Sequence, residues 1–232
     1  MTGYIAGDAL YALHEKHPDY EYSALVRTQE KADIVKKAFP NIRIVVGGND
    51  DSDLLKEEAA KADVVLRKWK ISPYQLHNIP LTTLPDAADA SDHEGAAKAI
   101  AEGIRSGHSK ENPGYWLHTG GTGILTYQDS EADRLGEWSE KEYNDWSGVD
   151  ELTNLPDSAF HRNVDKVVLE AGIKHADVIK TNIVCPPTIY GTSHLAPCPP
   201  SSQQGILLIY VPQATAAAQS TNAAAKSTSS PN

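Results

Sequence analysis

The sequence predicts an α/β fold: a doubly wound parallel sheet that lacks its first strand and carries a residual C-terminal extension. Over residues 1–66, helical spacing of apolar residues alternates with short apolar runs rich in β-branched residues, and the connections are short. The same alternation returns between residues 92 and 184. Helices that alternate with short buried strands are typical of parallel sheets with helices on their faces.

The first part of the chain, residues 1–66, contains three predicted helices and three predicted strands. We expect helices over residues 3–16, 29–39 and 52–61, and strands over residues 22–26, 42–46 and 62–66. Pro18 and Pro40 stand just beyond the first two helices, where a proline ends a helix.

The second part, residues 87–195, is predicted to hold helices over 92–106 and 158–175 and strands over 115–118 and 179–184. Residues 67–86 show neither periodicity and contain three prolines, which indicates an irregular insertion. Residues 128–157 are acidic and too long for a plain connection, so we expect a functional excursion over the site. Residues 196–232 are rich in Pro, Ser and Ala, and we expect this tail to be disordered.

Composition excludes several classes of function. The formal net charge of -10 disfavours nucleic acid, because non-specific affinity for phosphates comes from Lys and Arg. The only cysteines, Cys185 and Cys198, show no paired spacing, so we expect no disulfide framework or zinc site, a buried thiol at Cys185 and a reducing compartment. The histidines show no ligand spacing; we expect no metal and place most of them at the surface or at helix ends. No apolar stretch is long enough to span a membrane, and we expect a soluble cytoplasmic protein.

The start of the chain resembles the second half of a glycine-rich dinucleotide-binding turn. Gly3 and Ala6 have the spacing of the small residues that let the backbone approach a pyrophosphate and let the helix pack on the sheet. This makes Gly3, Tyr4 and Ile5 candidate cofactor-binding residues. The strand that should precede the turn is absent from the sequence.

Five segments in order resemble the extended short-chain dehydrogenase/reductase superfamily, and more narrowly its atypical fungal NAD(P)-binding or NAD-dependent epimerase/dehydratase-like members. They are residues 2–7, 25–27, 48–51, Lys166 and residues 186–191. The resemblance covers about residues 2–66 and 87–191. It implies a Rossmann-like fold with NAD(P)-binding parts at 1–66 and 87–195, and hydride transfer between a nicotinamide and a carbonyl or alcohol substrate.

The chain departs from that family in three places: the missing first strand, the insertion at 67–86, and the sequence after residue 191. We therefore expect a late start, a retained intron and an altered 3′ end in the reading frame.

The resemblance also implies catalytic residues. The family uses a tyrosine followed four residues later by a lysine; Lys166 matches the lysine, but Arg162 stands at the tyrosine position and cannot act as an acid near neutral pH. Thr119 and Thr122 follow a strand and can replace the family's Ser or Thr. A phenol displaced from the excursion, Tyr127 or Tyr143, is an alternative, as is a half-buried structural role for both. Lys166 can equally be a solvated helix lysine.

Charge at the strand ends bears on the cofactor. Arg27 follows the strand at 22–26 with no carboxylate beside it, which favours the 2′-phosphate of NADP, with NAD left open. By resemblance, Asn49 and Asp50 lie where the family binds adenine, and Pro186 lies at the cofactor. Local roles stay open: Arg27 as a solvated strand-end charge, and Asn49 and Asp50 as a turn and helix cap.

The leading interpretation is an NAD(P)-dependent oxidoreductase with a small-molecule substrate and no nucleic-acid or membrane partner, and with a homodimer left open. One alternative is a catalytically silent NAD(P) sensor or regulatory protein, as in the related nitrogen-metabolite repressor type, which Arg162 favours. A defective form that binds no cofactor is the third.

Overall fold

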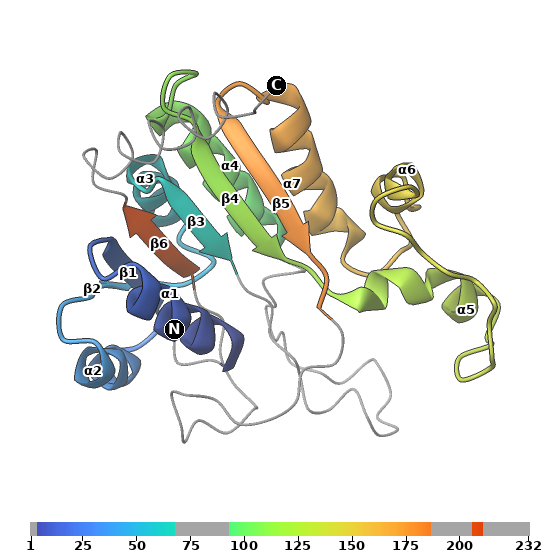
Figure 1. Ribbon diagram of the computed structural model, residues 1–232, viewed down its shortest axis with the longest axis horizontal. Helices are drawn as coiled ribbons and strands as arrows, with labels where there is room; N and C mark the ends of the chain where they lie inside the picture. Colours follow the sequence, from blue (N-terminus) through green and yellow to red (C-terminus); the bar gives the residue numbers. More distant parts are fainter. Residues whose placement is uncertain (1–3, 68–92, 187–205, 211–232) are drawn as a thin grey trace, which may run out of the picture.

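The computed structural model describes residues 4–67, 93–186 and 206–210 of the 232-residue chain (Figure 1). These residues form one six-stranded sheet with helices on both faces, so the predicted α/β, Rossmann-like fold class is confirmed. The predicted insertion at 67–86 lies outside the described residues except for Arg67, and so do Gly3 and most of the tail.

The strands follow the order β2-β1-β6-β3-β4-β5. Their bounds are β1 Glu21–Val26, β2 Arg43–Val46, β3 Val64–Arg67, β4 Gly114–Thr119, β5 Ile179–Val184 and β6 Ile206–Tyr210. β1 and β2 pair in parallel, as do β3 with β4 and β4 with β5. β6 runs antiparallel to both of its neighbours, β1 and β3.

β6 occupies the centre of the sheet, where a doubly wound fold of this order has its first strand. Ile206 lies between Leu25 of β1 and Arg67 of β3 in the register. The expected disorder of the tail is therefore wrong for Ile206–Tyr210. The physical reason is that a five-residue apolar run satisfies the backbone donors and acceptors of β1 and β3, which would otherwise be left unpaired inside the sheet.

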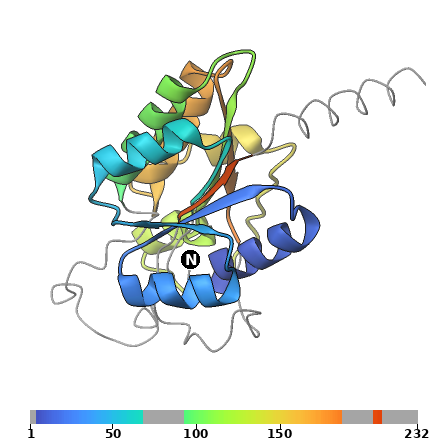
Figure 2. The same cartoon turned by 90° about the vertical axis from the view of Figure 1, so that its left-hand side faces the viewer.

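Two helices, α1 (Tyr4–Lys16) and α2 (Gln29–Ala38), cover one face of the sheet over β1 and β2. The other face is covered by a layer of three helices, α3 (Ser52–Lys61), α4 (Glu94–Gly107) and α7 (Arg162–Lys174) (Figure 2). Gly103 and Gly107 of α4 lie against the backbone of α3, where a Cβ atom would collide with the carbonyls of Lys56 and Ala60. The two helices therefore pack closely because α4 has glycine at these positions.

Short helical turns fill the region between β4 and α7. They are the 3₁₀ turn η2 (Thr122–Thr126), α5 (Tyr127–Glu131) and α6 (Val149–Thr153), and they stand out from the sheet at one end of the molecule (Figure 1). The helix predicted to begin at residue 158 begins at Arg162 instead. Its N-cap, His161, has φ 66°, a left-handed conformation that separates the helix from the turn before it.

Candidate functional site

The carboxyl ends of the five parallel strands share one edge of the sheet, and the chain changes direction there. From β1 the chain crosses to β2 on one side, and from β3 it crosses to β4 and then β5 on the other. Open α/β sheets bind ligands at such a switch point, outside the carboxyl ends of the strands. The residues that follow each strand at this edge are therefore the candidates for a ligand site.

Arg27 and Thr28 follow β1. Arg27 is exposed, and the side chain of Thr28 accepts a hydrogen bond of 3.4 Å from the Lys31 amide and so caps α2. No carboxylate occupies either position. The guanidinium of Arg27 is thus the charged group that β1 contributes to the edge.

Asn49 and Asp50 follow β2, and His93 links Asp50 to the rest of the edge. Asn49 is buried, whereas the side chain of Asp50 is 90% exposed. His93 Nε2 lies 2.9 Å from Asp50 Oδ1, and His93 Nδ1 accepts from the Ala96 amide at 3.0 Å. Arg67 Nη2, fully buried at the end of β3, donates to the His93 carbonyl at 2.8 Å. The structure therefore joins the ends of β2 and β3 to the N-terminus of α4.

Thr119 ends β4, and Thr122 begins η2 three residues later. The hydroxyl of Thr122 donates to the Pro186 carbonyl at 3.3 Å, and the Gly120 amide donates to the Val184 carbonyl at 2.9 Å. The predicted residues Thr122 and Pro186 are thus brought together at the ends of β4 and β5.

Lys166 lies elsewhere. Its Nζ atom pairs with Asp157 Oδ1 at 2.8 Å, and the side chain lines a groove of about 590 Å³ between α4 and α7. This ion pair lowers the pKa of Asp157. Within the described residues no contact joins Lys166 to Thr119 or Thr122, so its catalytic role stays a prediction.

Arg162 opens α7 and is buried, with 7% of its surface exposed. Its Nη2 atom donates to the Thr153 carbonyl at 2.7 Å, which ties α6 to the start of α7. A guanidinium is not deprotonated in proteins, so this residue holds α6 in place and does not act as an acid.

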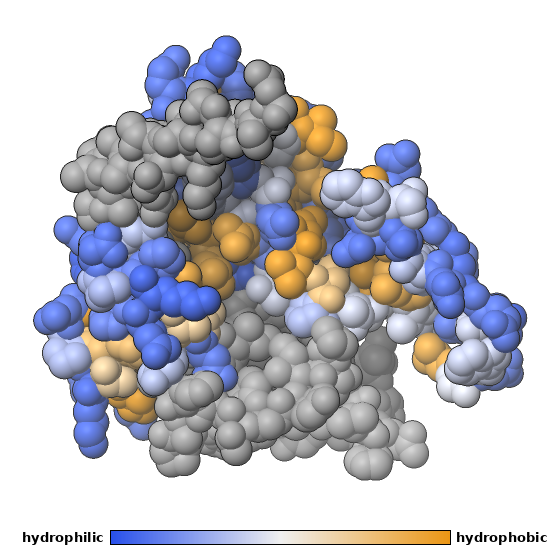
Figure 3. Space-filling view, in the orientation of Figure 1, coloured by the Kyte–Doolittle hydropathy of each residue, from blue (hydrophilic) through white to orange (hydrophobic). Residues whose placement is uncertain are grey.

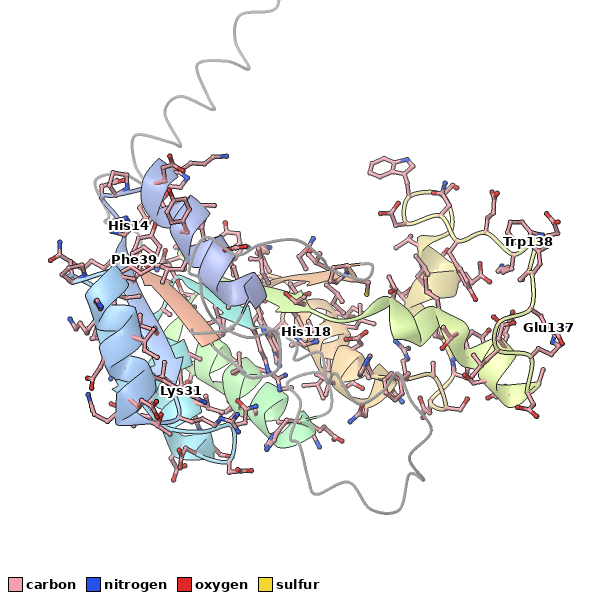
Figure 4. All side chains as sticks on the ribbon, turned by 90° about the horizontal axis from the view of Figure 1, so that it is seen from below. His14, Lys31, Phe39, His118, Glu137 and Trp138 are labelled. Carbon is pink, nitrogen blue, oxygen red and sulfur yellow. The ribbon has the colours of Figure 1, made fainter. Side chains whose placement is uncertain are left out.

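A buried pair that the sequence analysis missed lies beneath this edge. His118 of β4 is fully buried, and its Nε2 atom is 3.3 Å from Oδ1 of Asp165 on α7; Figure 4 labels His118. Burial lowers the pKa of His118, and the Asp165 carboxylate opposes that effect. His118 is therefore an exception to the expectation that most histidines lie at the surface or at helix ends, because alternate residues of β4 face the helix layer.

Two signals could have identified the pair. His118 is two residues from Trp116, which is also fully buried, as strand periodicity requires. His161, the N-cap of α7, stands four residues before Asp165, the spacing of one helix face, and both residues are buried. What sequence cannot supply is the contact between β4 and α7.

Cys185 was expected to be buried and is exposed instead, because it follows the last residue of β5 at the sheet edge. Its Sγ atom still approaches Gly120, where an added Cβ would lie 3.3 Å from Sγ and 3.4 Å from Asp165 Oδ1. Partial loss of water around the sulfur, together with the Asp165 charge, raises the pKa of the thiol to about 11. The thiol is therefore protonated and a weak nucleophile near neutral pH.

The two candidate phenols lie on the segment after β4. Tyr127 accepts a hydrogen bond of 2.9 Å from Gln128, and the Tyr143 hydroxyl donates to the Leu125 carbonyl at 3.5 Å. Burial raises the pKa of Tyr143. Both rings are half-buried, and no described contact places either beside Thr119.

Among the described residues, no group of three His, Cys, Asp or Glu side chains is arranged to hold a metal ion. None of the described helices has the length and apolar character needed to cross a membrane.

No protein-family profile matches the chain. A curated protein of Acremonium sp. named Oxidase ucsJ is 38% identical over 194 residues. The match covers 82% of this chain and 49% of that protein, so the chain spans about half the length of the relative.

Proposed function

We propose that this chain is the cofactor-binding part of an NADP-dependent oxidoreductase acting on a small carbonyl or alcohol substrate. The observation that carries the proposal is the switch point between β1 and β3, with an exposed arginine directly after β1. The name of the Acremonium relative, an oxidase, supports the same reaction class. When bound, NADP would supply hydride chemistry.

The residues at the edge fit the adenosine end of that cofactor. A guanidinium binds a phosphate through two parallel hydrogen bonds, and a carboxylate in the same place would instead favour unphosphorylated ribose. Arg27 would supply the guanidinium. The next residue, Thr28, caps α2 and brings no carboxylate to this place. Asn49 and Asp50 at the end of β2 would border the adenine, and Gly3, Tyr4 and Ile5 would approach the pyrophosphate.

Thr119 and Thr122 at the end of β4 would hold the oxygen of the substrate. The Thr122 hydroxyl already donates to the Pro186 carbonyl, so it is oriented at the end of β5 before any ligand binds. Lys166 would have to leave Asp157 to reach the same place, which argues for Thr122 as the stronger of the two candidates.

The experiment is a fluorescence titration of the chain with NADPH and NADH. We expect tighter binding of NADPH, and an Arg27→Ala variant that loses about tenfold in NADPH affinity with little change for NADH. Arg134→Ala removes an exposed arginine away from the sheet edge and is the matched control. Equal binding of both nucleotides by wild type and Arg27→Ala would contradict the assignment of Arg27.

A second candidate function is a sensor that binds the nucleotide without turnover. It is favoured by Arg162, which stands where the resembled family has its catalytic tyrosine and is bonded to the Thr153 carbonyl. Consumption of NADPH with any member of a panel of aldehydes and ketones would favour the enzyme. Binding with no consumption across the panel would favour the sensor.

A further inference from the structure

Residues 127–157 form a projecting segment that we call the acidic arm. The arm contains ten acidic and two basic residues, so it carries most of the net charge of -10 of the whole chain. It extends away from the sheet at one end of the molecule (Figure 1), and much of its surface there is hydrophilic (Figure 3). Such a concentration of negative charge produces a strong local potential that attracts a cationic partner.

The arm also exposes large apolar side chains. Trp138 is 87% exposed, Trp146 is 90% exposed and Leu135 is 66% exposed. Figure 4 shows Trp138 beside Glu137 on the arm, far from His118. Tryptophan is enriched in the centres of protein interfaces, where it supplies a large contact area, and two such rings in solvent on one short segment suggest a surface that a partner covers.

The arm has a defined local structure. The Asn144 side chain accepts from the amides of Trp146 and Ser147 at 2.9 and 2.8 Å, and Lys141 pairs with Glu151 at 2.5 Å. Lys141 Nζ also lies 5.0 Å from the centre of the Tyr143 ring. The tryptophans are therefore presented by turns that hydrogen bonds and ion pairs hold in place.

A cleft of about 210 Å³ lies beside Trp138. It is lined by the carboxylates of Asp129, Glu137 and Glu140 together with Trp138, Arg134 and Ser139. The indole N–H of Trp138 donates to Glu140 at 2.7 Å, which fixes the ring next to a carboxylate. The cleft lining contains three carboxylates against the single guanidinium of Arg134, which suits it to a further guanidinium or ammonium group.

We propose that the acidic arm binds a basic polypeptide, with one arginine or lysine side chain of that partner in the Trp138 cleft. Charge complementarity identifies the partner as cationic, and the exposure of Trp146 and Leu135 outside the cleft indicates a contact larger than a single small cation.

The test is binding of a fluorescently labelled ten-residue arginine peptide, followed by anisotropy. Relative to wild type, we expect about tenfold weaker binding by Trp138→Ser and by Glu137→Gln/Glu140→Gln. Glu15→Gln/Glu30→Gln removes the same charge from exposed positions on α1 and α2 and should bind like wild type. Circular dichroism checks that each variant keeps the fold.

Three outcomes would overturn the proposal. Equal weakening by both charge variants with no effect of Trp138→Ser would mean that the peptide senses net charge alone. Binding of N-acetylarginine amide as tight as that of the peptide would mean a small-cation site. A wild-type dimer in sedimentation that Trp138→Ser converts to a monomer would mean that a second copy of the chain occupies the arm. None of these outcomes depends on NADPH binding.

Discussion

The strands on the two sides of β6, β1 and β2 on one side and β3, β4 and β5 on the other, are buried to different degrees. β1 is buried at five consecutive residues, 22 to 26, because α1 and α2 cover one of its faces and the α3 side of the molecule covers the other. β4 alternates instead: Trp116 and His118 are fully buried, while Tyr115 is 47% and Leu117 is 37% exposed. Among the residues that the structure describes, the doubly wound arrangement is therefore complete over β1 and one-sided over β4.

This difference shows which strand patterns the fold requires. A parallel strand covered on both faces has a continuous apolar sequence, and a strand covered on one face alternates. β6 joins the two sides, since β1 and β3 each pair with it and not with each other.

The largest effect is expected at β6, which joins the two sides of the sheet. Leu208→Pro removes a backbone donor from the middle of β6, between Ser23 of β1 and Val65 of β3. Proline in a central strand also clashes with its neighbours, and we expect a loss of about 3 kcal/mol or more in the free energy of unfolding. Chemical denaturation measures it, with Leu208→Val as the control that keeps the donor. A Leu208→Pro variant as stable as Leu208→Val would show that β6 does not join the two sides.

A smaller effect separates the two sides directly. Ala24→Asp places a carboxylate at a fully buried position of β1 and should cost about 3 kcal/mol. Leu117→Asp makes the same kind of change on the exposed face of β4 and should cost about 1 kcal/mol or less. Thermal unfolding of the two variants measures the contrast. Equal losses would mean that the outer face of β4 is as closely packed as β1.

The smallest effect concerns pH and the His118–Asp165 pair. Because burial lowers the pKa of His118, the unfolded chain binds this proton more readily than the folded chain. The stability that comes from keeping His118 neutral is fully present above the ordinary histidine pKa of about 6.5. As the pH falls from there through the folded pKa, the free energy of unfolding decreases by at most about 1.4 kcal/mol per pH unit.

Denaturation of wild type at a series of pH values between neutral and mildly acidic measures that slope. His118→Asn should flatten it, whereas His175→Asn, at the end of α7, should leave it unchanged. An identical slope in wild type and His118→Asn would mean that His118 is not held in its neutral form by the fold.

Local sequence patterns predicted most of the sheet and failed where distant segments decide the structure. The helix at 52–61 and the strand at 179–184 have the predicted bounds, because periodicity and flanking residues define them. β6 could not be placed, since a short apolar run becomes a central strand only through pairing with β1 and β3. The alternation of β4 also shows that a strand of a parallel sheet can be buried on one face and partly exposed on the other.

The candidate site was predictable to a similar extent. Thr122 and Pro186 were both named from the sequence, and the structure brings them together because β4 and β5 are neighbours. Lys166 was assigned by resemblance to a family in which a lysine follows a tyrosine by four residues. Only tertiary packing shows that Asp165 faces His118 and that Lys166 pairs with Asp157.

The position of β6 also has a consequence for folding during synthesis. Its partner β1 emerges from the ribosome early, whereas residues 206–210 emerge only after β5 and α7 have been made. Until then the facing edges of β1 and β3 expose unpaired backbone groups, which is the condition under which strands of different molecules associate. Pairing between segments so far apart in sequence is also slow to form. Overproduction of this protein should therefore be sensitive to the rate of translation and to chaperones that shield strand edges.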